Sequence, residues 1–316
     1  MLQNAVSEKA IKKHSFGNRV KQDFKLNKLK YLMVLPVIIY FIIFAYKPMY
    51  GILIAFQDFK PQLGIAGSKW VGFENFTRFF SDPSAKRVIV NTFRISVWSI
   101  IIGFPAPILL ALLINEIKNK FFKRVVQTVT YMPYFISMVV MCSLIKVFTQ
   151  SDGFISHFLG NFGLIQTNLL ANKTLFLPIY IISGIWQTVG WDSIIYLAAL
   201  SGIDQEQYEA ARIDGAGRFK QMIHVTIPGI RATIIILFIL RMGGILNVGF
   251  EKILLLYSPS TYQVADVIST YVYRMGILNA DFSYSTAIGL FNNIVNILVL
   301  LLTNKIAKMT TDSGLF

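Results

Sequence analysis

Polar and charged side chains occur inside long apolar stretches of this 316-residue chain, and they are the first candidates for chemistry. Asp192 lies among Trp186, Gln187, Trp191 and Tyr196. Saccharides present hydroxyl groups at their edges and apolar C–H faces, so carboxylate, amide and aromatic groups together suit sugar binding. Helical spacing puts Gln187 and Trp191 on one face. Because tryptophan near a membrane interface is also a common anchor, both interpretations stay open.

Two further pairs of polar residues share this helical spacing. Asn247 and Glu251 are four residues apart, as are Asn292 and Asn296, so each pair is expected on one helix face. These side chains either line a path for a polar solute or hydrogen-bond neighbouring helices. Lys252 lies near the end of an apolar run, where a lysine is expected to extend towards water.

Catalytic, metal and nucleotide chemistry find less support. Asp192 with Glu251, or Glu206 with Glu209, would supply the two carboxylates of glycoside hydrolysis, so an intramembrane glycan-processing enzyme remains an alternative. The three histidines lack metal-ligand spacing, and the single cysteine, Cys142, excludes an intrachain disulfide. No G-x-x-x-x-G-K followed by Ser or Thr is present, so we expect this chain to bind no cofactor and to depend on a partner for ATP.

The composition indicates a membrane protein. The chain is 54% apolar and only 15% charged, against about 25% charged residues in an ordinary soluble domain. Its apolar runs are continuous and long enough for helices that cross a bilayer, which takes about 20 residues each. The sequence therefore predicts an all-α integral membrane protein with six transmembrane helices, in the runs 31–56, 88–114, 125–148, 175–200, 232–257 and 286–302.

The distribution of positive charge predicts the orientation. Eighteen of the 30 lysines and arginines fall in residues 1–30, 118–124, 201–231 and 305–308. By the positive-inside rule these segments are cytoplasmic, which gives N-in and C-in topology. Attraction of the basic tail to anionic lipid explains its charge with fewer assumptions than nucleic-acid binding does. We expect a basic cytoplasmic tail at 1–30, a membrane domain at 31–305 and a short cytoplasmic tail at 306–316.

The cytoplasmic segment 201–231 is expected to form two short helices. Asp204 is a capping residue for the first helix, and Gly215 is suited to end it in a left-handed conformation. Pro228 is expected to interrupt the chain directly before the fifth run. The segment resembles the EAA loop of permease subunits of bacterial binding-protein-dependent ABC importers. The matching residues are Glu209, Ala210, Ala211, Asp214, Gly215, Ala216 and Pro228, with Val225 and Ile227 as conservative departures from the usual Ile and Leu.

Other segments extend the resemblance to most of the chain. Tyr46-Lys47-Pro48-Met49-Tyr50-Gly51, Trp70-Val71-Gly72-Phe73-Glu74-Asn75-Phe76 and Gly249-Phe250-Glu251-Lys252-Ile253 are similar to segments of the LplB-like, or MalF-like, sugar permeases. The resemblance implies a type I ABC importer permease for an oligosaccharide or polysaccharide fragment, working by alternating access in a bacterial, Gram-positive plasma membrane. A peptide or another polar solute is the alternative cargo.

The resemblance also implies the partners. They are a second homologous permease subunit, two ATP-binding subunits that carry ATP and Mg²⁺, and an extracellular lipid-anchored solute-binding protein that faces loops 57–87 and 258–285. Glu209, Ala210, Ala211 and Gly215 would lie in the coupling helix that docks into the ATP-binding subunit. A protruding pair of helices with a fixed glycine break is a rigid lever, suited to pass the movement of that subunit to the attached spans.

Overall fold

The computed structural model describes residues 23–163, 167–311 and 314–315, and the chain divides into two compact units, Met1–Leu53 and Ile54–Phe316. Residues 1–22 of the predicted basic tail lie outside the described residues. The division between the units falls inside the first predicted span.

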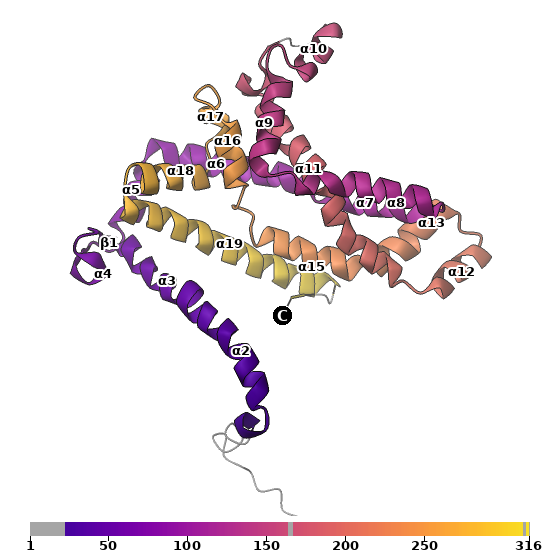
Figure 1. Ribbon diagram of the computed structural model, residues 1–316, viewed down its shortest axis with the longest axis horizontal. Coiled ribbons are helices and arrows are strands. Elements are labelled where there is room, and N and C mark those ends of the chain that lie inside the picture. The colour runs from indigo at the N-terminus through magenta and orange to yellow at the C-terminus, as the bar shows by residue number, and fades with distance from the viewer. Residues whose placement is uncertain (1–22, 164–166, 312–313, 316) are drawn as a thin grey trace, which may run out of the picture. The chain divides into compact units, whose positions relative to one another are not determined.

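The first unit is dominated by one apolar helix (Figure 1). It consists of α2 (Lys28–Phe41), a π-helical turn (Ile42–Tyr46) and α3 (Lys47–Met49), and no side chain in these three elements is buried. A 3₁₀ turn (Tyr50–Phe56) continues it across the unit boundary. A helix that is apolar on all sides needs lipid or a partner around it, so this segment is suited to a bilayer.

The second unit is helical apart from one short hairpin within the part of the chain that the structure describes. Its elements before α11 are β1 (Gln57–Asp58), α4 (Gly64–Gly67), β2 (Lys69–Trp70), α5 (Glu74–Ser81), α6 (Pro83–Gly103), α7 (Pro105–Glu116), α8 (Lys120–Tyr131), a 3₁₀ turn (Met132–Phe135), α9 (Met138–Thr149), α10 (Phe154–Asn161) and a 3₁₀ turn (Leu169–Ala171). The remaining elements are α11 (Phe176–Ser201), α12 (Gln205–Ile213), α13 (Arg218–Gln221), a π turn (Met222–Thr226), α14 (Ile227–Gly229), α15 (Arg231–Met242), α16 (Phe250–Leu256), α17 (Tyr262–Ala265), α18 (Ile268–Tyr273), a π turn (Arg274–Leu278) and α19 (Phe282–Thr311). In the hairpin, Gln57 pairs with Trp70 in antiparallel register.

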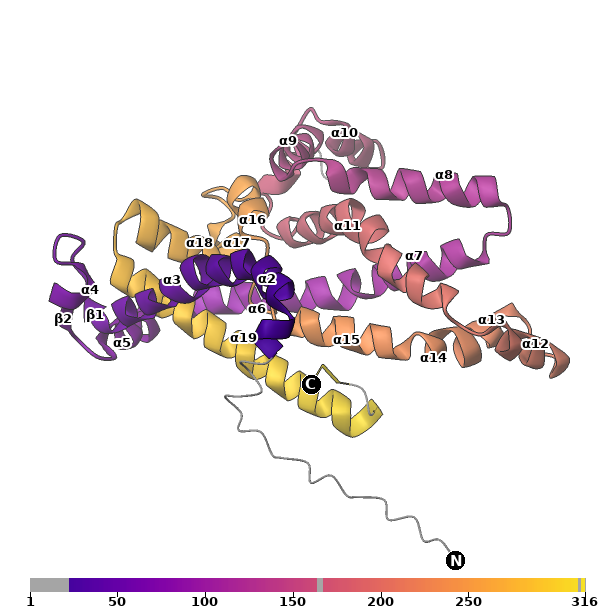
Figure 2. The ribbon, with the colours of Figure 1, turned by 60° about the horizontal axis from the view of Figure 1, so that its bottom comes forward.

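Helix α11 is the central helix of this unit. It packs along α7 and also contacts α6, α8 and α15, and Figure 2 shows it between α8 and α7. Two buried clusters of apolar side chains each include residues of α11. One surrounds Phe176 and Tyr180 near its beginning, and the other surrounds Tyr196 and Leu200 near its end. A side chain that points from α11 into a cavity is therefore held by packing at both ends of the helix.

A polar network joins segments that are far apart in the sequence. Asp266 is almost fully buried and accepts two hydrogen bonds from Arg274, at 2.7 and 3.2 Å, while Arg87 lies 3.6 Å from the same carboxylate. Burial alone lowers the pKa of Arg274, but the hydrogen bonds and charge of Asp266 raise it above its ordinary value overall. The network connects the beginning of α6 to the α17–α18 turn and to the π turn that follows α18.

A second carboxylate connects the same elements. Asp82 caps α6 by accepting from the backbone N–H of Ser84 at 2.7 Å, and it also accepts from the Tyr271 hydroxyl at 2.6 Å. Burial raises the pKa of Asp82, but these hydrogen bonds outweigh it and keep the pKa below its ordinary value. Both networks join segments predicted to lie on one side of the membrane.

Four helices within the described ranges are long and apolar enough to cross a membrane: Lys28–Phe56, Pro83–Glu116, Met138–Asn161 and Phe282–Thr311. A fifth candidate span results if the helices Arg218–Gly229 and Arg231–Met242, which are bent by 60° at their junction, form one span. Helix α11, which covers the fourth predicted run, has 26 residues but does not meet this apolarity criterion. The count of six spans therefore remains a prediction.

Two of the six predicted runs are divided between separate helices, whereas α6 and α7 continue each other as one apolar helix, Pro83–Glu116. The run 125–148 is divided between α8 and α9, because the turn containing Pro133 separates them. The run 232–257 is divided between α15 and α16 by residues 243–249, which include three glycines. The apolar content of these runs is continuous, but glycine and proline end the helices within them.

Pro228 does not interrupt the chain where the sequence predicts. The π turn Met222–Thr226 ends with the N–H of Ile227 donating to Met222, and the helix then continues through Pro228 to Gly229. Pro48 follows the π turn Ile42–Tyr46 in the same position. Since proline has no N–H and crowds the carbonyl four residues before it, a widened turn directly before it lets the helix continue. The bend comes later, at Ile230.

Candidate functional site

The first candidate site is the pair of short helices α12 and α13. The Asp204 carboxylate caps α12 by accepting from the N–H of Glu206 at 3.0 Å, as predicted. The helix ends in a Schellman motif, in which Gly215 N–H donates to Arg212 and Ala216 N–H to Ala211. Gly215 has φ +75°, the left-handed conformation that the sequence predicts. A Cβ at Gly215 would meet no atom within 4 Å, so its backbone angle, and not crowding within the chain, favours glycine.

The two short helices protrude with an exposed apolar tip. Figures 1 and 2 show α12 and α13 together at one end of the unit, beyond α11 and α15. Ile213 is 87% exposed and Phe219 is 69% exposed, and Glu209 and Ala210 are also exposed. Apolar side chains exposed on a protruding tip are typical of a docking surface for another protein.

The base of this tip is fixed to the helix bundle. Ile203 and Ile230 are buried against Leu112 of α7 and Leu200 of α11. Gly229 allows this contact, because a Cβ there would lie only 2.8 Å from Ile203 Cδ1. The hydroxyl groups of Tyr208 and Thr226 lie 3.0 Å apart and connect α12 to the following π turn. A displacement of the tip would therefore move α7 and α11.

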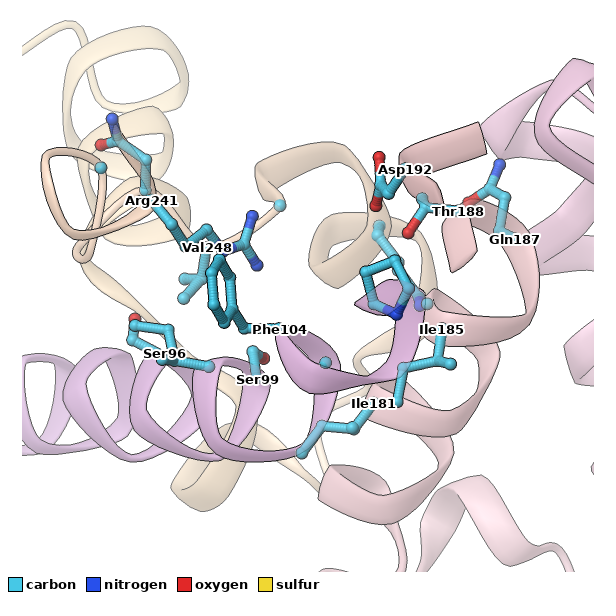
Figure 3. A pocket seen from close by; sticks show the side chains of 18 of the residues that line it. Ser96, Ser99, Phe104, Ile181, Ile185, Gln187, Thr188, Asp192, Arg241 and Val248 are labelled. Carbon is cyan, nitrogen blue, oxygen red and sulfur yellow. The ribbon is translucent and has the colours of Figure 1, made fainter. Parts of the chain in front are cut away.

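The second candidate site is a cavity of about 560 Å³ between α6, α11, α15 and α16. Its size is typical of ligand sites. Figure 3 shows Asp192 and Thr188 of α11 on one side and Arg241 of α15 on the other. The polar residues that line it are Ser96, Ser99, Tyr180, Gln187, Thr188, Asp192, Tyr196, Arg241, Asn247 and Lys252.

Of the nine residues predicted to lie on a substrate path, four line this cavity: Gln187, Asp192, Tyr196 and Asn247. Gln187 also donates to the carbonyl of Ile136 at 3.2 Å. Trp191 shares its helix face but stacks on Tyr134, with ring centroids 4.5 Å apart. Trp191 therefore packs against the connection between α8 and α9.

The other four predicted residues, Trp186, Glu251, Asn292 and Asn296, do not line the cavity. Asn292 and Asn296 share one face of α19, as predicted, and both donate to Asn247 Oδ1, at 3.0 and 3.2 Å. These hydrogen bonds agree with the second interpretation given above, in which the two asparagines hydrogen-bond a neighbouring segment. The expectation that Asn247 and Glu251 share a helix face is wrong, because Asn247 lies before the start of α16.

Lys252 corrects another expectation. It does not extend to water but is 5% exposed and lines the cavity, with Nζ donating to the carbonyl of Tyr180 at 2.7 Å. Arg241 of α15 and Ser96 of α6 line the same cavity. No local pattern places them together, because they lie on helices more than a hundred residues apart.

Comparisons with known proteins identify the family of this chain. Residues 103–308 match the family described as the binding-protein-dependent transport system inner membrane component. The chain belongs to this family of transport-system membrane components. Protein LplB of Bacillus subtilis (strain 168) is 45% identical over 293 residues, covering 92% of each chain. The polygalacturonan/rhamnogalacturonan transport system permease protein YteP of the same organism is 45% identical over 290 residues, covering 92% of this chain and 90% of that protein.

A solved structure extends the comparison to the fold. A chain in the crystal structure of a bacterial alginate ABC transporter, in complex with alginate pentasaccharide-bound periplasmic protein, superposes with a TM-score of 0.87. That chain is 43% identical, and the match covers 94% of this chain and 100% of the other. The permease fold is therefore shared along nearly the whole length.

Proposed function

We propose that this chain is one of two permease subunits of an ATP-driven importer that carries an oligosaccharide or polysaccharide fragment across a bacterial plasma membrane. The observation that supports it most is the combination of a polar cavity between helices and a protruding tip fixed to those helices. The names of YteP and of the alginate transporter support a saccharide as cargo.

The arrangement suits alternating access. Two ATP-binding subunits would hold ATP and Mg²⁺, and one of them would grip α12 and the glycine turn at Gly215. Because Ile203 and Ile230 fix this tip to α7 and α11, closure of the ATP-binding subunits would shift the walls of the cavity. An extracellular binding protein would deliver the saccharide, facing the segments 57–87 and 258–285. In this proposal the chain has six spans with both termini in the cytoplasm.

Reconstitution tests the proposal. Proteoliposomes containing this chain, its second permease subunit and the ATP-binding subunits are supplied with the binding protein and a labelled oligosaccharide. We expect uptake that requires ATP and hydrolysis that the saccharide stimulates. Stimulation by peptides and by no glycan would support the alternative cargo, and conversion of a glycan without the ATP-binding subunits would indicate an enzyme.

Gly215→Trp tests the coupling role. The substituted chain should still insert and assemble, because a Cβ at Gly215 faces open space, with no atom beyond the adjacent residues within 4 Å. The left-handed angle is strained for tryptophan by roughly 1–2 kcal/mol, which the isolated tip should tolerate. ATP hydrolysis should continue while uptake falls at least tenfold. Gly217→Trp is the control, because a Cβ at Gly217 also has no atom within 4 Å but the backbone there has a φ of −67°. Normal uptake by Gly215→Trp would contradict the coupling role of Gly215.

A further inference from the structure

We propose that Lys252 forms an anion site in the cavity and that the carried saccharide bears carboxylate groups, as a uronic acid does. This inference rests on the proposed function and deepens it. The comparisons name what the relatives carry, but the argument for this chain comes from the charges that line its own cavity.

Lys252 is held in place by contacts on several sides. Its Nζ donates to the Tyr180 carbonyl at 2.7 Å and lies 4.6 Å from the centroid of the Tyr180 ring. Gly184, one helical turn further along α11, leaves room for the ammonium group, because a Cβ there would lie 3.1 Å from Nζ. The side chain is thus fixed in a cavity wall.

No carboxylate among the described residues forms an ion pair with the ammonium group. It has three N–H donors, and the structure shows one hydrogen bond from it, so two donors remain for a ligand. Lys252 forms none of the ion pairs among the described residues. Glu251 is its neighbour in sequence but is exposed and lines no part of the cavity. A buried cation without a counter-ion is costly, so a bound anion would be stabilised there.

The balance of charge among the residues that line the cavity also favours an anionic ligand. Its lining includes two cations, Arg241 and Lys252, and one carboxylate, Asp192. Asp192 can balance one cation and leaves the cavity with an excess positive charge. Hydroxyl-bearing neutral sugars need acceptors and donors but no such excess, whereas a uronic acid carboxylate accepts charge-assisted hydrogen bonds from an ammonium group. The hydroxyl groups of the same sugar would meet Ser96, Ser99 and Thr188.

Direct binding to the purified complex tests the inference without the selectivity of the binding protein. The complex of the permease pair with its ATP-binding subunits is titrated with an oligogalacturonate and an alginate oligosaccharide. Each is compared with its own carboxyl-reduced form, in which the acids are primary alcohols. We expect the wild type to bind at least one acidic form about tenfold or more tightly than the reduced form, as a charge-assisted contact requires.

Substitutions assign the preference to one residue. Lys252→Met should reduce the ratio of acidic to reduced affinity to near one, while Lys252→Arg should keep most of it. Loss of packing alone would weaken both forms equally and leave the ratio unchanged. Lys146→Met, at an exposed lysine of α9 that does not line the cavity, is the matched control and should retain the wild-type ratio.

The outcomes separate this inference from the proposed function. Equal affinity for acidic and reduced forms, or an unchanged ratio in Lys252→Met, overturns the anion site. Equal affinity is also the result if the second permease subunit supplies a carboxylate to Lys252. ATP-dependent uptake of a neutral oligosaccharide with no preference for acids would preserve the importer and remove the anion site. ATP-dependent uptake of no glycan would remove the saccharide function itself.

Discussion

At the scale of single residues, glycines decide how closely the helices approach. Gly190 of α11 is buried where the backbone of α8 crosses it, and a Cβ there would overlap the carbonyl of Thr130. Gly289 of α19 has no atom within 4 Å of the same position. The two residues look alike in the sequence, yet only one of them is required by close packing within the chain.

This contrast predicts different costs for one substitution. Gly190→Ala should destabilise the isolated subunit by about 1–3 kcal/mol, as overpacking does. Gly289→Ala should leave it unchanged or stabilise it by up to about 1 kcal/mol, because alanine favours helix. Thermal unfolding of both variants in the same detergent measures the difference. Equal unfolding temperatures would show that α8 and α11 move apart readily.

At the scale of elements, the buried carboxylate of Asp266 holds α6, the α17–α18 turn and the π turn after α18 together. Its side chain is 1% exposed, whereas the partner side chains Arg274 and Arg87 are 23% and 41% exposed. Breaking such a pair leaves an uncompensated charge, which costs more than the pair itself contributes. The exposed pair Lys60–Asp58, with 4.0 Å between Nζ and Oδ2, lacks this effect.

Substituting each aspartate compares the two pairs. Asp266→Asn should lower the free energy of unfolding by about 3 kcal/mol, because Arg274 and Arg87 lose their shared charge partner. Asp58→Asn should cost less than about 1 kcal/mol. Denaturant or thermal unfolding of the purified subunit measures both. A similar small loss in the two variants would mean that water reaches Asp266 and screens its charge.

At the scale of the whole molecule, the orientation in the membrane decides which segments meet which partner. In the proposed six-span topology, with N-in and C-in, the α12–α13 tip lies on the cytoplasmic side, where it can meet an ATP-binding subunit. Cys142 is buried and is the single cysteine, so cysteines introduced elsewhere can report accessibility against a low background. Lys69, Lys118 and Lys308 are exposed and occupy three different predicted segments.

Labelling with a membrane-impermeant maleimide tests that orientation. Lys69→Cys should react in intact cells, since it lies in an extracellular segment of the proposed topology. Lys118→Cys and Lys308→Cys should react only after the membrane is permeabilised. Wild type supplies the background from Cys142. Reaction of Lys118→Cys in intact cells would contradict both the span count and the sidedness.

The sequence by itself determined the properties that depend on composition and local spacing. Apolar content indicates membrane helices, and the Asp204 cap and the Gly215 turn form as predicted because they depend only on neighbouring residues. The shared face of Asn292 and Asn296 follows from helical spacing within α19.

Only the tertiary structure decided which polar groups meet. Asp192, Arg241 and Lys252 line one cavity, although they lie on three helices whose packing no local pattern specifies. Lys252 is buried because Gly184 of another helix leaves room for it. Trp191 does not line the cavity because its ring stacks on Tyr134. The breaks in the runs 125–148 and 232–257 likewise decide which side chains share a face. Hydropathy measures apolar content and carries no information on such long-range contacts.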